Sequence, residues 1–594
     1  MHTGSWFLAL MLVSNVVMAM PPAYCIYRYV FGFLMNGLNF MALFVVIGIG
    51  ADDAFIVADG WAQARRTSSI TTTDQRAGFV FARAVPAMAT TSITTMAAFM
   101  ATSISTIPAI FTFGFFAASV VLCNYLLICT FYIAAVSKWD AGCCCGCVAA
   151  PPPPSPGDEE ADQRRPTEKF LEDSLAPWLH AHRKPLLSSF AMIVLVACVI
   201  ASGLETESTE KSFLPDDSNL ANIGPAMARF PLSSTSDLIT VTVSVGIKTI
   251  DRDKMDKSDR DDRGEVVFDA AFSATRVQAS FVQLCDAVSK VDKKWLQRVN
   301  GCVVQKFKKW VLANNKTAVT WPLPEATYNS AMMKWLTSGG GGYISYAGMS
   351  LAPRVQYLAF SFVTTLNDEV KGKVRDEHFE FWDAFFREFK ASHPQLAKLQ
   401  MTSIAWRDKA TMDTLVNTAL YGMSISVLLA AVVMAFATRD VILTAFATLT
   451  IACIVVTLVA AYVLMGVTMG FMESINLAFV AGLAVDYTLH LAHAYRHSPR
   501  RTRLERSADS LGVIGISVVN GCATTLLASG FLFFAFIRMS VAFGLTIFIS
   551  VSLSLFYAFF MFMTLLVTFG PENLDAAEAA ADIQMEKVAP VEGA

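Results

Sequence analysis

Charged residues are scarce in this chain. Only 16% of its 594 residues are Asp, Glu, Lys or Arg, whereas 54% are hydrophobic, and the mean hydropathy is positive. Soluble domains carry nearer a quarter of charged residues. The deficit argues against a soluble domain and indicates a polytopic α-helical membrane protein. The net charge of −3 says nothing useful about nucleic acid or other polyanionic partners, and we predict no nucleic-acid partner.

Signatures of catalysis are missing as well. The sequence holds no glycine-rich phosphate loop, no metal-ligand spacing and no pairing of a nucleophile with a base. We therefore predict neither an enzyme nor a resident cofactor or metal. The first apolar stretch also lacks a preceding Lys or Arg and a strong cleavage site, so we predict a membrane helix there rather than a signal peptide.

Long runs without a charged residue supply the membrane helices. About 20 apolar residues cross the hydrocarbon core of a bilayer. The run 84–137 is long enough for two helices, with a break expected near Pro108. The sequence predicts ten helices in groups of four, one and five: 4–27, 29–51, two within 84–137, 185–204, 414–438, 441–472, 474–494, 510–537 and 539–571.

The polar stretches between these runs set the domain boundaries. The sequence predicts six parts: a first membrane repeat over 1–137, a cytosolic Pro- and Cys-rich linker over 138–184, a membrane helix over 185–204, an extracellular or lumenal α/β domain over 205–410, a second membrane repeat over 411–571 and a cytosolic tail over 572–594. The linker contains PPPPSP at 151–156 and mixed charge, which is typical of disorder.

Basic residues set the orientation. Lys and Arg gather in the loop 60–83, in the linker 138–184 and in the loop 496–506. Short loops rich in Lys and Arg lie in the cytosol, and ten alternating helices then place 205–410 outside. Asn315 begins an Asn-Lys-Thr acceptor triplet for N-glycosylation, which fits that placement but is common by chance.

Cysteines indicate two further features. The outer region has only Cys285 and Cys302, which could pair in a disulfide or remain two free buried thiols. The cytosolic run GCCCGC follows the first repeat and contains Cys143, Cys144, Cys145 and Cys147. S-acylation of these juxtamembrane thiols is the preferred interpretation. A metal site and a tolerated cysteine-rich tract stay open, although adjacent cysteines match tetrahedral metal spacing poorly.

Two distant parts of the chain share one spacing pattern. Gly48 precedes Asp52 by four residues, and Gly482 precedes Asp486 by four. A Thr-Thr pair and a glycine follow at matching distances in both copies: Thr94-Thr95 with Gly114, and Thr524-Thr525 with Gly544. We infer a parallel internal duplication, an arrangement in which transporters bind substrates between the repeats. The first copy is incomplete by this symmetry, and a truncated gene model or a natural half-transporter would explain it.

Acids inside apolar helices are costly and mark ion or proton pathways. Asp52 lies about 13 residues into its span, with Asp53 next to it, and Asp486 lies at a similar depth in its counterpart. Like charges in a low dielectric cannot all stay ionised without a cation, so we predict that these carboxylates bind H⁺ or Na⁺. Gly48 and Gly482 are expected to let the repeat helices approach closely and to leave room for an ion.

Other titratable residues lie near these acids. His490 and His493 follow Asp486 by four and seven residues and share its helical stripe. A proton relay toward the cytosol is one interpretation, and contact with headgroups or loops at a wet helix end is the other. Asp59, seven residues after Asp52, is expected to be an exposed acid at a helix end.

These motifs resemble a known family. GIGADDAF together with GLAVDYTLHLAHAYRHSP resembles the Dispatched branch of the RND superfamily, which also contains Patched, Niemann–Pick type C and bacterial MmpL proteins. The family pattern of Gly-x-x-x-Asp-Asp and Gly-x-x-x-Asp falls on Gly48, Asp52, Asp53, Gly482 and Asp486. Patched and Niemann–Pick relatives usually carry Glu at the last position, which favours Dispatched. FLPDDSNL at 213–220 also resembles the start of the family's second outer domain.

The resemblance implies a fold of the RND type. Residues 1–137 would form most of a sterol-sensing domain, without its first helix, and 205–410 would form an α/β porter-like domain. Alternating residues predict strands at 237–250 and 355–366, and an amphipathic helix is expected at 373–392. The first outer domain of the family and its flanking helices have no counterpart here.

Two functional hypotheses follow from the acids and the resemblance. The first is a cation-gradient-driven transporter that exports or releases a sterol, lipid or lipid-modified cargo. The alternative is a Patched- or Niemann–Pick-like sterol-responsive receptor, or a sterol transporter without coupled export. The expected partners are the lipid bilayer and a sterol or lipidated cargo, and both a monomer and a homo-oligomer stay open. We expect a multi-pass protein of the plasma membrane, with endosomal membranes as the second choice.

Overall fold

The computed structural model describes most of the chain. The described residues are 5–67, 70–105, 107–142, 166–204, 218–219, 238–252, 264–314, 321–350, 354–367, 373–470, 473–477, 482 and 484–572, without the side chains at 43–47, 49, 66 and 326. Asn315, the cysteines at 143–147 and most of 213–220 lie outside these ranges. Glycosylation and S-acylation therefore stay predictions.

The chain divides into two compact units. Unit 1 comprises Met1–Glu205, Ser212–Pro215 and Thr414–Ala594, and unit 2 comprises Thr206–Lys211 and Asp216–Asp413. The main division falls within one continuous helix, α14 (Ile404–Thr438).

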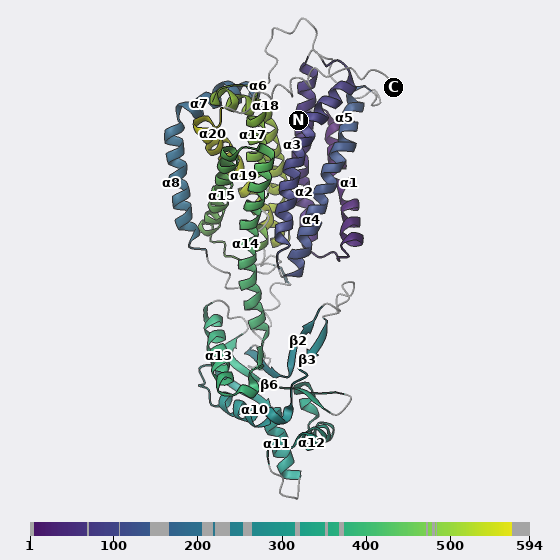
Figure 1. Ribbon diagram of the computed structural model, residues 1–594, viewed down its shortest axis with the longest axis vertical. Coiled ribbons are helices and arrows are strands. Elements are labelled where there is room, and N and C mark those ends of the chain that lie inside the picture. The colour runs from purple at the N-terminus through teal and green to yellow at the C-terminus, as the bar shows by residue number, and fades with distance from the viewer. Residues whose placement is uncertain are drawn as a thin grey trace. The chain divides into compact units, whose positions relative to one another are not determined.

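Unit 1 is a bundle of long helices (Figure 1). The first repeat contains α1 (Trp6–Cys25), η1 (Ile26–Val30), α2 (Asn39–Arg66), α3 (Thr73–Thr102), α4 (Pro108–Leu127), η2 (Ile128–Tyr132) and α5 (Ile133–Asp140). The second contains α8 (Arg183–Ala201), α14, α15 (Val441–Leu464), α17 (Asp486–His497), α18 (Arg503–Phe531), η6 (Leu532–Phe534), α19 (Arg538–Phe556), η7 (Tyr557–Phe562) and α20 (Met563–Phe569). The repeats meet where α2 packs against α18 and α3 packs against α17.

Eight described helical runs are long and apolar enough to cross a membrane. The sequence predicted ten, so that number is not confirmed. The two predicted spans outside the eight are 29–51, which Asp52 and Asp53 directly follow, and 474–494, which contains Asp486. The expected break near Pro108 is confirmed, because α3 ends at Thr102 and α4 begins at the proline. Proline suits a first helical turn, whose N–H groups have no partner within the helix.

The predicted loop 60–83 is largely helical. α2 runs on to Arg66 and α3 begins at Thr73, so all four arginines of this stretch lie on helices. A capping box closes the start of α3. The Thr72 side chain accepts a hydrogen bond from the backbone N–H of Gln75, and the Gln75 side chain accepts one from the backbone N–H of Thr72. The box satisfies backbone groups that would otherwise be unpaired, which is why the helix starts here.

Part of the predicted linker is helical as well. The segment consists of α6 (Pro166–Lys169), η3 (Phe170–Leu175) and α7 (Ala176–Ala181), and it packs on α18 and α20. Leu171 and Leu179 are buried, and Leu171 lies against Gly515 of α18. The expectation of disorder is therefore wrong over 166–181, because the segment buries an apolar face.

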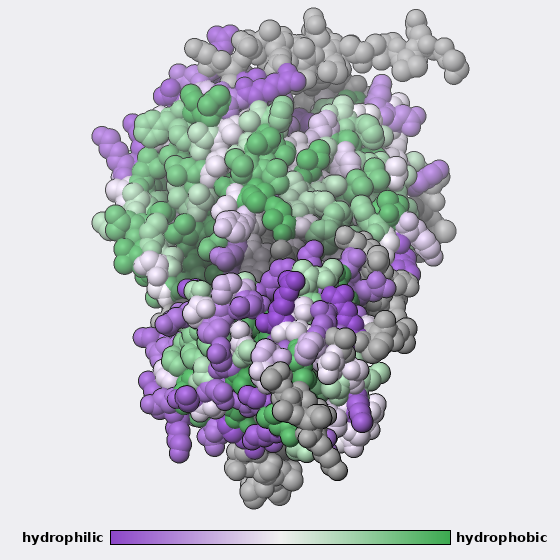
Figure 2. Space-filling model, turned by 60° about the horizontal axis from the view of Figure 1, so that its bottom comes forward, coloured by the Kyte–Doolittle hydropathy of each residue, from purple (hydrophilic) through white to green (hydrophobic). Residues whose placement is uncertain are grey.

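The outer surface of unit 1 is strongly apolar. Figure 2 shows hydrophobic side chains gathered over its helices on the face turned to the viewer. Exposed apolar residues include Leu195 and Val199 of α8 and Leu428 and Phe436 of α14. A surface of this kind is stable in contact with lipid, so unit 1 is an integral, multi-pass membrane unit.

Unit 2 is built on an antiparallel sheet. The strand order is β4 (Leu296–Cys302), β6 (Val355–Asn367), β1 (Leu238–Val245) and β7 (Gln400–Thr402), and β5 (Ala347–Met349) also pairs with β6. A separate hairpin joins β2 (Ile247–Asp251) to β3 (Glu265–Phe268). The strand predicted at 237–250 is split at Gly246, whose φ of 102° glycine adopts readily. The strand predicted at 355–366 is confirmed as β6.

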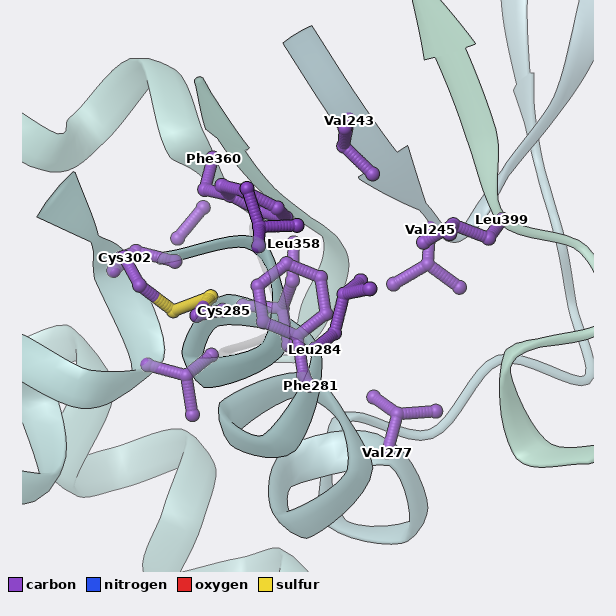
Figure 3. Packing of buried hydrophobic residues seen from close by; sticks show 14 of the residues in the cluster. Val243, Val245, Val277, Phe281, Leu284, Cys285, Cys302, Leu358, Phe360 and Leu399 are labelled. Carbon is purple, nitrogen blue, oxygen red and sulfur yellow. A yellow bond between two sulfur atoms is a disulfide. The ribbon is translucent and has the colours of Figure 1, made fainter. Parts of the chain in front are cut away.

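Helices cover the core face of this sheet. They are α10 (Ala274–Ser289), α11 (Val303–Asn314), α12 (Glu325–Ser338) and α13 (Lys373–Ser392), with the short turns η4 (Gly341–Tyr346) and η5 (Pro394–Leu396). The helix predicted at 373–392 is confirmed as α13. Figure 3 shows Phe281 and Leu284 of α10 packed with Phe360 and Leu358 of β6. The Phe281 and Phe360 rings lie 5.6 Å apart, so the sheet and helices share one apolar core.

The two cysteines of unit 2 are paired. Cys285 of α10 and Cys302 at the end of β4 form a disulfide, with their Cα atoms 6.1 Å apart (Figure 3). Of the two alternatives left open by the sequence, the structure contains the disulfide. The bond ties a covering helix to the sheet across the core.

Candidate functional site

One small cavity lies where the two repeats meet. It is lined by Gly50, Asp52 and Asp53 of α2, Thr91, Ser92 and Thr95 of α3, Val121 and Asn124 of α4, and Asp486 and His490 of α17. It has room for about one water-sized particle. The structure thus brings the three predicted carboxylates together, from both repeats.

Hydroxyl groups of α3 bind two of the carboxylates. Thr95 Oγ1 donates to Asp486 Oδ1 over 3.2 Å, and Ser92 Oγ donates to Asp53 Oδ2 over 3.5 Å. Asp52 Oδ1 is buried without a hydrogen-bond partner among the described residues. The Asp52 carboxylate also interacts electrostatically with the other two acids. A cation or a proton would relieve the repulsion at this carboxylate.

Each repeat packs its threonine-bearing helix against the acid-bearing segment of the other. Thr525 Oγ1 of α18 donates to the carbonyl of Gly48 over 3.3 Å, and a Cβ on Gly48 would lie 3.1 Å from Thr525 Cγ2. Gly482 faces Ala98 of α3, which leaves no room for a Cβ. The glycines therefore give close approach as predicted, but to the threonine helix of the other repeat.

The histidines are placed differently from one another. His490 lines the cavity and is 5% exposed, whereas His493 is not among the described residues that line it. The His493 ring instead stacks on His497, with ring centroids 4.2 Å apart. The relay stays a prediction, and the geometry supports it for His490 alone.

Asp59 contradicts its prediction. It is 9% exposed, and its Oδ2 accepts a hydrogen bond from Ser517 of α18. The sequence suggested an exposed helix end, but α2 continues to Arg66 and keeps Asp59 inside the contact with α18. Asp59 is thus a buried acid of α2, and it is not among the residues that line the cavity.

Several cavity residues were missed by the sequence. Thr91, Ser92 and Asn124 carried no signal, because a polar residue on a membrane helix can face any neighbour. Thr95 carried one, since it is the second member of a threonine pair repeated in both copies. Carboxylate, hydroxyl and amide oxygens are ligands preferred by small hard cations, and the carboxylates can also carry protons.

Comparisons with known proteins show which proteins the chain resembles. The model of the sterol-sensing domain of SREBP cleavage-activation matches residues 2–140, which coincide with the predicted first repeat. Protein dispatched homolog 1 of Mus musculus is 23% identical over 635 residues, covering 96% of this chain and 41% of that protein. The chain is similar to Dispatched proteins over nearly its whole length. NPC intracellular cholesterol transporter 1 of Sus scrofa is 21% identical over 548 residues, covering 81% of the chain and 40% of that protein.

A solved structure of a Dispatched protein shares the fold. The cryo-EM structure of the hedgehog release protein Disp from the water bear Hypsibius dujardini matches with a TM-score of 0.72 at 18% identity. The match covers 96% of this chain and 68% of the water-bear chain, and at this identity it concerns the fold alone. The Dispatched-like chain spans about 41% of the length of the mouse relative.

Proposed function

We propose that this Dispatched-like protein couples a gradient of Na⁺ or H⁺ to the export or release of a sterol, lipid or lipid-modified cargo. Asp52, Asp53 and Asp486 would form the cation site. The observation that carries the proposal is the cavity in which both repeats contribute a carboxylate. Because the site lies between the repeats, loading it alters the attraction between them and favours one relative arrangement over another.

The orientation belongs to the same proposal. The basic segments 60–83, 138–184 and 496–506 would face the cytosol, and unit 2 would lie outside the cell. The disulfide in unit 2 supports this placement, because disulfides persist in oxidising compartments. We place the protein in the plasma membrane, where an exported cargo would leave the cell.

A second candidate function is sterol response without coupled export. The match to the sterol-sensing domain over 2–140 favours it, as does the likeness to an intracellular cholesterol transporter. Under this alternative the first repeat binds sterol, and the acids need bind no cation. The two candidates therefore differ in what the carboxylates do.

Efflux of a fluorescent sterol from proteoliposomes distinguishes the two candidates. The wild type is compared with Asp52→Asn/Asp53→Asn/Asp486→Asn under an imposed gradient of Na⁺ or H⁺. Asp59→Asn is the matched control, because Asp59 is a buried acid of the same helix outside the cavity lining. Coupled transport predicts gradient-driven efflux in the wild type and the control, and its loss in the triple variant. Equal efflux from all three proteins, or none from the wild type, contradicts coupled transport by this chain.

A further inference from the structure

Two buried asparagines connect the acid cavity to α1. Asn124 of α4 lines the cavity and is 3% exposed. Asn15 of α1 is fully buried, and its Nδ2 donates to Asn124 Oδ1 over 3.1 Å. A polar amide inside an apolar membrane helix is unfavourable unless its groups are bonded. The pair is therefore a specific feature of the wall around the acids.

Gly50 places the Asn124 amide directly against α2. A Cβ on Gly50 would lie 3.0 Å from Asn124 Oδ1 and 3.2 Å from Asn124 Nδ2. The same Cβ would lie 3.1 Å from Val16 Cγ2 of α1, so the glycine admits both the amide and α1. The amide consequently lies beside the backbone two residues before Asp52.

One atom of the asparagine pair has no partner. Asn15 Oδ1 is buried without a hydrogen-bond partner among the described residues. An amide has a donor end and an acceptor end of nearly the same shape, so it can turn over within the same space. If both amides turn, Asn124 Nδ2 donates to Asn15 Oδ1, and the pair keeps one hydrogen bond. The two side chains thus fit two arrangements.

We propose that Asn124 changes its role with the occupancy of the cavity and that Asn15 is the positioning residue that permits the change. In the arrangement observed, Asn15 engages Asn124 Oδ1, and the Nδ2 group is left to donate to carboxylates in an empty cavity. In the turned arrangement, Asn124 Oδ1 faces the cavity as a ligand for a small hard cation, or as an acceptor for a protonated carboxyl. This inference rests on the proposed cation site.

The thermal stability of the purified full chain tests the inference without knowledge of the cargo. Melting is measured against NaCl, with choline chloride holding the ionic strength constant, and separately against pH in choline chloride. A ligand that binds only the folded state adds RT ln(1 + [L]/Kd) to the free energy of unfolding, which raises the melting temperature without a plateau. A fit of this dependence gives the half-maximal cation concentration, at which half of the folded sites are loaded. The variants are Asn15→Leu, Asn124→Leu and Asn15→Asp.

Asn39→Leu is the matched control. Asn39 is 1% exposed and lies on α2, where its Nδ2 donates to the Tyr27 hydroxyl over 3.1 Å, and it is not among the residues lining the cavity. This variant removes a buried amide of the same kind. It is expected to lower the melting temperature in choline chloride while leaving the half-maximal cation concentration unchanged.

The asparagine variants are expected to change affinity in opposite directions. Asn15→Leu and Asn124→Leu should raise the half-maximal cation concentration by about tenfold, since one oriented oxygen ligand is lost. In Asn15→Asp, the carboxylate can only accept a hydrogen bond, so Asn124 donates to it through Nδ2. Asn124 Oδ1 then stays turned toward the cavity. This variant should lower the half-maximal concentration and slow maximal efflux. If Asn15→Leu does not fold, Asn15→Ser takes its place with a smaller increase.

The outcomes separate the inference from the proposed function. A wild type that responds to Na⁺ or H⁺, with Asn15 variants that behave like Asn39→Leu, overturns the role of Asn15 and leaves the cation site standing. A wild type that shows no response to either ion, like the triple acid variant, overturns the cation site itself. Opposite shifts in Asn15→Leu and Asn15→Asp support the inference, because a merely structural asparagine would weaken binding in both.

Discussion

The two membrane repeats share a framework. Both threonine helices begin with a capping box, formed by Thr72 with Gln75 in α3 and by Thr502 with Glu505 in α18. Both are followed by a helix, α4 or α19, that leads into a π-helical segment, η2 or η7. Thr95 and Thr525 occupy matching positions, and each binds the acid-bearing segment of the other repeat. The backbone is thus repeated along with the sequence spacing.

The residues placed on this framework differ between the repeats. Asp53 follows Asp52 in the first repeat, whereas Tyr487 follows Asp486 in the second. The position of Asn124 is held by Ser554 in the second repeat, and Ser554 donates to the carbonyl of Ala484 over 2.9 Å instead of lining the cavity. Among the described residues the cavity walls come mostly from the first repeat, while the second supplies Asp486 and His490. The comparison indicates one shared site rather than two equivalent ones.

Neutralising a single acid should have the largest effect. Asp52→Asn or Asp486→Asn alone is expected to reduce gradient-driven efflux by roughly 100-fold. Each change removes one negative charge from a buried site, so the bound cation loses one of its charged ligands. Efflux of a fluorescent sterol from proteoliposomes measures this. Two independent sites would instead leave about half of the activity after either change.

Adding a methyl group beside Asp52 should have the next largest effect. A Cβ on Gly521 would lie 2.8 Å from Asp52 Cγ, so Gly521→Ala must displace the carboxylate. We expect the half-maximal cation concentration in the melting experiment to rise roughly tenfold. The matching change in the first repeat, Thr91→Ala, removes atoms and should raise it by only about threefold. Equal effects at the two positions would argue for a symmetric site.

Of the two matched threonines, the one in the first repeat should matter more for cation binding. Thr95 donates to a carboxylate and Thr525 donates to a backbone carbonyl. Hydrogen bonds to charged groups are about twice as strong as neutral ones. Thr95→Val is therefore expected to raise the half-maximal cation concentration by about tenfold, and Thr525→Val by about threefold. A reversed order, measured in the same melting experiment, would contradict the asymmetry.

The capping boxes should give the smallest change in cation binding. Thr72→Ala and Thr502→Ala should each lower the stability of the folded chain by about 1 kcal/mol, since each removes the same kind of cap. Neither should change the half-maximal cation concentration, because both caps lie at helix starts away from the cavity. Thermal unfolding with and without Na⁺ measures both quantities. A clear change in cation affinity in one variant alone would tie that helix start to the site.

The acids of the site were predictable because the repeat marks them. Asp52 and Asp486 occupy equivalent places in two copies, and acids in apolar helices are rare enough to be informative. Ser92, Asn124 and Asn15 were not predictable, since their roles depend on which neighbour each helix face meets. The prediction that Asp59 is exposed was wrong for a similar reason, because its burial depends on how far α2 runs beside α18.

The fold shows the same division. The break at Pro108, β6 and α13 followed from local residue patterns that the structure confirms. The split of the predicted strand at Gly246 required a turn that alternation alone does not reveal. The helices over 166–181 depend on burial of Leu171 against α18, a contact between distant parts of the chain. Local pattern identifies elements, and tertiary packing decides where they end.

A thermodynamic cycle on cation binding tests the shared site most directly. The purified wild type, Asp52→Asn, Asp486→Asn and the double variant are titrated with Na⁺ and with H⁺, and the affinity of each is taken from the shift in melting temperature. One shared site predicts that the double variant binds no more weakly than the weaker single variant. Losses of binding free energy that add across the two acids would contradict the account, because additivity indicates two sites that act independently.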